Sequence, residues 1–364
     1  MTGIAVPTPA TEAELAGIVA DHHARRAPLR IAGGGTRVEN HAPGTPLSLS
    51  RLSGIVDYSP AEMTLIARPG TPLPQIQAML AAEGQALAFD PPDLRGVTGA
   101  TGTPTLGGMV AANASGPRRM LAGACRDHLL GVRFVDGRGR ILKNGGRVMK
   151  NVTGLDLSKL LAGSHGTLAI LTEVVLKTLP LLPARTTLAV PDTDPATALR
   201  IFTAALATPF EVSGAVHIGT TTLLRIEGLE AQLAYRRDRL LALLAEWRPQ
   251  DRPGTDWTAI RDLAHVAGDG PLWRILCKPT DAPAICDGLR AMGGETALDW
   301  GGGLIWYRGP GNPRALAPHA TLIRRDGATG PAFPPQAGAL ARLQEGLRRA
   351  FDPAGILNPG LMEG

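Results

Sequence analysis

The sequence predicts an α+β protein of two domains, and three observations lead to that prediction. A chain of 364 residues is long enough for about two domains. Pro180, Pro183 and Pro191 interrupt the pattern midway, so we place a boundary near residue 181. Beyond it, a strand–helix–strand–strand–helix pattern occurs twice, which is typical of an antiparallel sheet with helices on one face.

The first half begins with a helix that has a clear start signal. Thr11 and Glu14 have the spacing of a capping box, and the helix should end near Arg26. Residues 90–108 are rich in Pro, Gly and Thr without periodicity, and an irregular stretch of this length is usually functional. The other predicted elements are strands at 29–31, 47–49 and 64–67, a helix at 72–83, a hairpin at 132–142 and a buried strand at 167–177.

In the second half, short apolar segments of the length of a strand alternate with longer segments whose apolar residues recur at helical spacing. The predicted strands are 187–190, 214–218, 222–227, 273–278, 297–300 and 304–308, and the predicted helices are 196–207, 229–247, 282–292 and 337–350.

Composition excludes several classes of function. The net charge is +5, but the basic residues are scattered and aromatic residues make up only 4%, so we expect no nucleic-acid partner. No stretch of 18 uncharged apolar residues occurs, and residues 1–10 lack a signal-peptide pattern. We therefore expect a cytoplasmic protein that does not itself span a membrane. Cys125, Cys277 and Cys286 are far apart, so this chain alone should hold no iron–sulfur cluster.

Three glycine-rich segments, at 32–37, 105–116 and 163–173, are the most informative feature of the chain. Glycine lacks a Cβ, so backbone N–H groups can converge on a pyrophosphate, although an ordinary turn is the alternative at each segment. The run from Gly33 to Val38 fails the GxGxxG fingerprint at its last position, which disfavours a Rossmann domain, and no Walker A loop occurs.

These segments, in this order, resemble the FAD-binding domain of the vanillyl-alcohol oxidase / p-cresol methylhydroxylase family. Within it, the chain is most similar to the FAD-binding E subunits of glycolate oxidase complexes. The resemblance extends essentially from end to end. The runs that carry it are 107–111, 115–119, 126–131, 148–157, 299–302 and 358–360.

The resemblance implies a PCMH-type FAD-binding domain of two subdomains at 1–181, an α+β cap domain at 182–320, and a C-terminal segment at 321–364 that returns to the flavin domain. FAD would lie extended between the two subdomains. Carried over by position, the expected FAD-binding residues are Ala32, Gly33, Gly34, Gly35, Thr36, Arg37, Gly102, Thr103, Gly107, Gly108, Ala111, Ala112, Asn113, Gly116, Gly166, Thr167, Ala169 and Ile170.

The chain also departs from relatives in this family. Covalent members often carry a flavin-linked histidine in or near the first two loops, whereas Thr36 follows the glycines here and no histidine lies between 42 and 127. We therefore expect non-covalent FAD. The paired histidines of metal-dependent relatives are absent, because His217, His265 and His319 are widely separated. We expect no metal and assign no catalytic residue.

The resemblance implies an FAD-dependent oxidoreductase that acts on CH–OH groups as part of a complex. Glycolate, a small 2-hydroxy acid, would be oxidised to glyoxylate, and electrons would leave the flavin through an iron–sulfur subunit. A larger homologous flavin subunit would be a further partner and could itself carry out the oxidation, and these partners could place the complex at the inner membrane. The alternatives are a stand-alone oxidoreductase of another hydroxy acid or alcohol, and a non-catalytic scaffold subunit.

Overall fold

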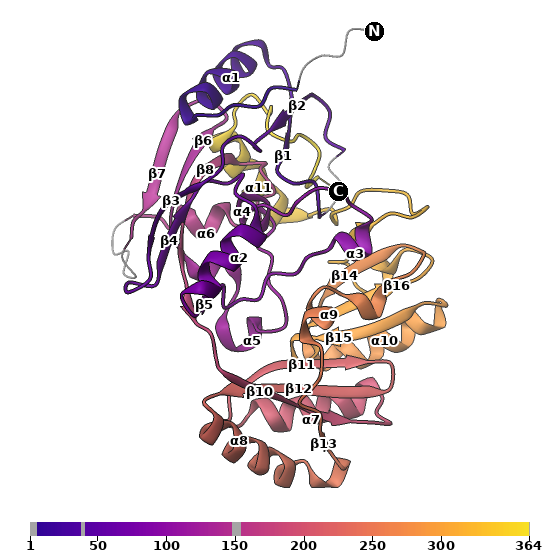
Figure 1. Ribbon diagram of the computed structural model, residues 1–364. Helices are drawn as coiled ribbons and strands as arrows, with labels where there is room; N and C mark the ends of the chain where they lie inside the picture. Colours follow the sequence, from indigo (N-terminus) through magenta and orange to yellow (C-terminus); the bar gives the residue numbers. More distant parts are fainter. Residues whose placement is uncertain (1–5, 38–40, 148–153, 364) are drawn as a thin grey trace.

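A five-stranded antiparallel sheet lies at the centre of the first half of the computed structural model, which describes residues 6–37, 41–147 and 154–363 (Figure 1). β8 is its middle strand and is buried along most of its length because nearly all of its side chains are apolar. In spatial order the strands are β3 (Ile55–Ser59), β4 (Thr64–Ala67), β8 (Ala169–Lys177), β6 (Leu129–Asp136) and β7 (Ile141–Gly145).

Short helices complete the core of this half. One of them, α2 (Leu73–Ala82), buries Leu73, Ile76 and Leu80 at helical spacing. The others are α3 (Arg95–Thr98), α4 (Leu106–Ala111), α5 (Arg119–Ala122) and α6 (Leu157–Leu161), while β5 (Gln85–Ala86) pairs with β9 (Leu179–Pro180).

A parallel pair of strands forms a second, smaller unit of the first half. β1 (Leu29–Ala32) pairs with β2 (Thr45–Ser48), and α1 (Glu12–Arg25) packs beside them. The C-terminal segment reaches the same place, since Leu357 bridges to Leu29 and the two lie in one apolar cluster. Segments more than 300 residues apart thus meet next to the first glycine loop.

The second half contains an eight-stranded antiparallel sheet, whose strands run from rose to orange in Figure 1. Its spatial order is β13 (Gln250–Asp251), β10 (Ala184–Val190), β12 (Thr221–Gly228), β11 (Val212–Ile218), β15 (Glu295–Asp299), β16 (Leu304–Arg308), β14 (Leu272–Leu276) and β17 (Thr321–Arg324). One face is covered by α7 (Pro195–Leu206), α8 (Glu230–Leu243) and α10 (Ala282–Ala291), which form the larger apolar core with it. α11 (Gly338–Phe351) follows the sheet and leads back to the first half.

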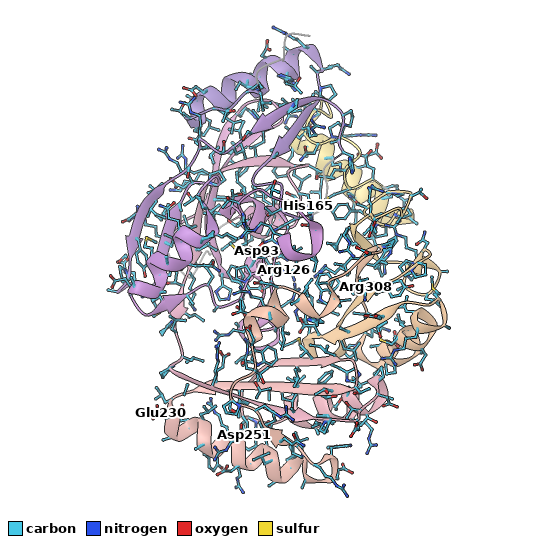
Figure 2. All side chains as sticks on the ribbon, turned by 45° about the vertical axis from the view of Figure 1, so that its right-hand side comes forward. Asp93, Arg126, His165, Glu230, Asp251 and Arg308 are labelled. Atoms are coloured by element: carbon cyan, nitrogen blue, oxygen red, sulfur yellow. The ribbon has the colours of Figure 1, made fainter. Side chains whose placement is uncertain are left out.

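The other face of this sheet meets the first half of the chain. Trp300 and Trp306 share an apolar cluster with Leu94 and Val97 from the first half. The amide N–H of Asp93, labelled at this junction in Figure 2, donates to the Asp262 carboxylate at 2.8 Å. The two halves are therefore joined by both apolar and polar contacts.

The structure confirms the predicted α+β class and differs from the predicted elements in a few places. α9 (Trp257–Arg261) packs on the sheet face opposite α7, so helices do not cover one face alone. The expected helix at 229–247 ends earlier, at Leu243. A separate 3-10 turn follows it, and Arg248, in the left-handed conformation, ends that turn and redirects the chain. β17 belongs to the eight-stranded sheet, which therefore extends past residue 320.

The remaining irregular elements are 3-10 turns at Cys125–His128, Ala245–Trp247, Ala264–Val266, Pro279–Asp281, Trp300–Gly302 and Pro313–Ala315. Within the described ranges, no helix combines the length and the hydrophobicity needed to cross a bilayer.

A buried carboxylate near the junction predicts a pH-dependent stability. Burial raises the pKa of Asp299 to about 7, against a hydrogen bond from the Trp300 amide that lowers it. The folded state then binds this proton more tightly than the unfolded state, so the contribution of Asp299 to stability falls as pH rises from about 4 to 7. Asp299→Asn should gain stability relative to the parent over that range, as measured by urea unfolding at pH 5 and pH 7.5. A stability difference that does not change between the two pH values would contradict this prediction.

Candidate cofactor-binding site

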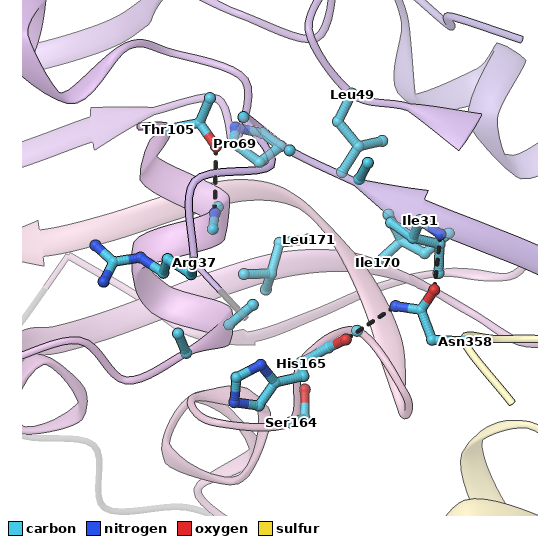
Figure 3. Close-up of a pocket in the computed structure, with 18 of the residues that line it drawn as sticks. Ile31, Arg37, Leu49, Pro69, Thr105, Ser164, His165, Ile170, Leu171 and Asn358 are labelled. Atoms are coloured by element: carbon cyan, nitrogen blue, oxygen red, sulfur yellow. Dashed lines mark hydrogen bonds between the residues drawn. The ribbon is translucent and has the colours of Figure 1, made fainter. Parts of the chain in front are cut away.

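One cleft in the first half is lined by parts of all three glycine-rich segments (Figure 3). Its empty volume is about 1060 Å³, including space at its open mouth. A cleft of this size fits a ligand larger than a simple metabolite. The predicted residues that line it are Ala32, Gly33, Gly34, Gly35, Thr36, Arg37, Gly107, Gly108, Ala111, Ala112, Gly166, Ala169 and Ile170.

The first segment presents unpaired backbone donors at this cleft. β1 ends at Ala32, whose carbonyl accepts a hydrogen bond from Leu49 N at 3.1 Å. From Gly33 to Arg37, the backbone N–H groups donate no hydrogen bond to any described residue. Successive unpaired amides in a glycine loop form a nest for an anion such as a pyrophosphate. The local structure therefore fits the phosphate-binding role predicted for this loop.

Two predicted residues support that loop from behind. A Cβ added to Gly34 would lie 1.8 Å from the Thr103 carbonyl oxygen, and one added to Gly102 would lie 1.8 Å from the Gly34 carbonyl oxygen. The two backbones approach each other so closely that neither glycine can carry a side chain. Gly102 and Thr103 do not line the cleft, and the structure gives them this supporting contact instead.

The second segment starts a short helix against the cleft. Thr105 caps α4 by accepting a hydrogen bond from Gly108 N, and Gly107 packs closely on Pro69. Ala111 and Ala112 at its end are small enough for a flat ring to approach, and both line the cleft.

The third segment is held against the second by its backbone. His165 N donates to the Ala111 carbonyl at 2.9 Å, and Gly163 N donates to the Val110 carbonyl at 3.1 Å. His165 and Gly166 both have positive φ angles, of 50° and 71°, which makes the sharp turn that precedes β8.

Three other predicted residues do not line the main cleft. Asn113 accepts a hydrogen bond from Arg126 N and lines a smaller neighbouring cavity. Gly116 contacts the second half, since its carbonyl accepts from the Trp300 indole N–H at 3.0 Å. Thr167 closes its own turn by donating to the Ser164 carbonyl. Their expected roles as FAD ligands stay predictions.

Sequence reasoning missed Asn358, which ties the cleft together from the far end of the chain (Figure 3). Its Oδ1 accepts from Ile31 N at 2.7 Å, and its Nδ2 donates to the His165 carbonyl at 2.9 Å. The run at 358–360 carried the resemblance, and the C-terminal segment was expected to return to the flavin domain, but Asn358 was not assigned to the site. Leu49, Pro69, Ser164 and Leu361 are further cleft residues that the sequence did not single out.

Replacing Asn358 should therefore loosen the cleft. Asn358→Ala leaves a partly buried amide and a partly buried carbonyl without this partner, and we expect a loss of about 2 kcal/mol in stability together with weaker FAD binding. Thermal unfolding and flavin release on dilution measure the two effects. Asn312→Ala is the control, because Asn312 caps a turn in the second half and its loss should lower stability without changing FAD affinity. Equal FAD affinity in both variants would contradict the prediction.

The cleft is electropositive. Burial lowers the pKa of Arg37 to about 10, which still leaves the guanidinium charged at neutral pH, and its Nη2 donates to the Pro92 carbonyl. Burial, together with Arg37 and Arg274, lowers the pKa of His165 to about 4, so this imidazole is neutral at pH 7. Among the described residues that line the cleft, none has an acidic side chain. In the described part of the chain, no group of three or more His, Cys, Asp or Glu is placed to hold a metal ion.

Comparison with known proteins shows the family of this chain. A family model described as "FAD binding domain" matches residues 4–145. Glycolate oxidase subunit GlcE of Escherichia coli (strain K12) is 34% identical over 348 residues, which are 93% of this chain and 93% of that protein. The chain belongs to the GlcE family.

Other matches of this GlcE family member are more partial. Glycolate oxidase subunit GlcD of Bacillus subtilis (strain 168) is 31% identical over 180 residues, 48% of this chain and 37% of that protein. A solved alkyldihydroxyacetonephosphate synthase has a TM-score of 0.71 at 16% identity, covering 97% of this chain and 75% of the other, and it shows the fold alone. Together the matches confirm the predicted family, its FAD-binding fold and FAD as the cofactor. Residues 148–153, part of one run that carried the resemblance, lie outside the described residues.

Proposed function

We propose that this chain is the FAD-binding subunit of a glycolate oxidase complex that oxidises glycolate to glyoxylate. The observation that carries the proposal is the match to GlcE over 93% of both chains, because it includes the second half as well as the FAD-binding half. The match to GlcD, by contrast, covers 48% of this chain.

The cleft fits FAD through the chain's own residues. The unpaired amides of residues 33–37 would bind the pyrophosphate, and Ala111 and Ala112 leave room for a flat ring. Bound FAD would supply the acceptor for the hydride, which carries both electrons away from the alcohol carbon. Arg37 and the neutral His165 lie in the cleft wall, where they would contribute charge and hydrogen bonding. Thr36 follows the glycines, in the region where covalent members of the family often carry a flavin-linked histidine. We therefore propose that FAD is bound non-covalently.

Partners follow from the chemistry that the chain lacks. Glycolate oxidation releases two electrons, and the three described cysteines are separate free thiols that hold no cluster ligand set. We therefore include an iron–sulfur subunit and a larger homologous flavin subunit in the complex, the latter supported by the similarity to GlcD. The complex would sit at the inner membrane through these partners.

Co-purification from the native cells tests the proposal. We expect a yellow protein that elutes with a larger flavin subunit and an iron–sulfur subunit, and a complex that reduces a soluble dye when glycolate is added. If the isolated FAD-loaded chain turns over glycolate at the full rate of the complex, it is a stand-alone oxidoreductase. If it carries no flavin absorbance, it is a scaffold.

A further inference from the structure

A second, smaller cavity lies where the cofactor cleft meets the second half of the chain. It shares Arg37, Ala112 and His165 with the cleft, so the two spaces are neighbours. Arg274 on β14 closes it from the eight-stranded sheet, beside Trp306 of β16. Its empty volume is about 580 Å³, including open space, against about 1060 Å³ for the cleft. This cavity therefore has room for a small ligand beside a larger ligand in the cleft.

The described charges that line this cavity are of one sign. Arg37 and Arg274 are its charged residues at neutral pH, and among the described side chains that line it there is no aspartate or glutamate. Asn113, Ser115, His165 and Thr321 supply its other polar side chains. Apolar groups such as Leu94, Ile323 and Phe333 form the rest of the wall. A low-dielectric wall strengthens the attraction of a cation for an anion.

These two arginines differ from three other arginines at the junction. Arg118, Arg225 and Arg261 each lie within 4.0 Å of a carboxylate oxygen. Within the described residues, by contrast, Arg37 donates only to the Pro92 carbonyl, and the Arg274 side chain makes neither a hydrogen bond nor an ion pair. Arg274 lies over the Trp300 ring at 5.1 Å, and Arg119 lies over the same ring at 4.4 Å, which adds further positive charge.

We propose that Arg274, together with Arg37, binds the carboxylate of a small organic acid in this cavity. The assignment rests on the proposed function, which makes that acid a 2-hydroxy acid. A guanidinium presents parallel N–H groups that match the two oxygens of a carboxylate, and Arg274 donates these groups to no residue in the described part of the chain. An anion here would also relieve the repulsion between two like charges contributed by the two halves of the chain. The consequence is that this subunit itself holds a substrate position beside its flavin.

Binding to the FAD-loaded chain tests the assignment without any turnover. Glycolate, its uncharged analogue ethylene glycol, and inorganic phosphate are each titrated while the flavin absorbance and the heat of binding are recorded. We expect glycolate to bind, and ethylene glycol and phosphate to bind much more weakly. Arg274→Met should weaken glycolate about 10- to 100-fold, the range for losing hydrogen bonds to a charged group, and Arg274→Lys should fall between. Arg290→Met, an exposed arginine on α10, is the matched control and should bind glycolate as the parent does.

Three results would overturn the assignment. One is unchanged glycolate affinity in Arg274→Met. Another is loss of FAD from that variant while its loaded fraction binds glycolate normally, which would make Arg274 a cofactor residue. The third is phosphate binding as tight as glycolate binding. Glycolate turnover by the whole complex is assayed separately, so a complex that does not oxidise glycolate contradicts the proposed function while the binding data still decide the carboxylate site.

Discussion

Gly34→Ala should leave the chain without bound FAD and lower its stability by about 3 kcal/mol, at the upper end of the usual cost of overpacking. The new Cβ would lie 1.8 Å from the Thr103 carbonyl oxygen and 2.7 Å from its carbon. These are backbone atoms, so no rotamer change relieves the overlap and one of the two segments must move. Because Gly34 lies among the unpaired amides of residues 33–37, that movement spoils the phosphate nest as well.

The flavin absorbance per protein and the thermal unfolding midpoint measure the two effects. Gly17→Ala is the matched control, because Gly17 lies exposed within α1 and a Cβ there meets no atom within 4 Å. Alanine is the better helix former, so this control should keep its FAD and gain about 0.5 to 1 kcal/mol. Stoichiometric FAD in Gly34→Ala would show that the loop is not the pyrophosphate site.

Arg225→Met should lower the free energy of unfolding by about 3 to 5 kcal/mol, the usual cost of breaking a buried ion pair. Arg225 is 3% exposed and lies 3.3 Å from Asp90 and 3.5 Å from Glu227, measured from guanidinium nitrogen to carboxylate oxygen. Asp90 belongs to the first half and Arg225 to β12 in the second, so this pair is a polar link between them. Methionine fills the space but leaves two carboxylates with less positive charge beside them.

Urea unfolding measures the loss, with Arg200→Met as the control. Arg200 is 66% exposed and 4.0 Å from Glu246, and an exposed pair of this kind contributes about 0 to 1 kcal/mol. If uncompensated carboxylates cause the loss, Asp90→Asn added to Arg225→Met should recover part of it. A loss in Arg225→Met no larger than that of the control would refute the buried network as a link between the halves.

Local patterns account for the elements that the sequence predicted well. Thr11 caps α1 by accepting from Glu14 N, as its spacing with Glu14 indicated, and Gly84 follows α2 in a left-handed conformation. These features depend on neighbours within a few residues, which the sequence displays directly. The missed elements are short or lack periodicity: β17 has four residues, and α9 has five.

The residues of the candidate site also fall into two groups, those that local sequence predicts and those that only folding brings to the site. Most of the glycines and alanines in the three segments line the cleft. Their absent or small side chains let a ligand approach the backbone, and that property can be recognised in the sequence. Asn358 and Ile31 are 327 residues apart, and nothing near either residue indicates their contact. Gly102 was expected to touch the cofactor, yet its place is set by Gly34, a neighbour created by folding.

By itself, the sequence determined the α+β class and the three loops suited to a phosphate-containing cofactor, because these depend on local periodicity and on residues without side chains. The family was indicated by the runs that resemble it. The tertiary structure decided which arginines are paired and which are left for a ligand. Arg225 and Arg274 lie on strands of the same sheet, but of these two only Arg225 meets a carboxylate among the described residues of the first half. That difference arises from long-range packing of the two halves, and it assigns Arg225 to the junction and leaves Arg274 facing the cavity.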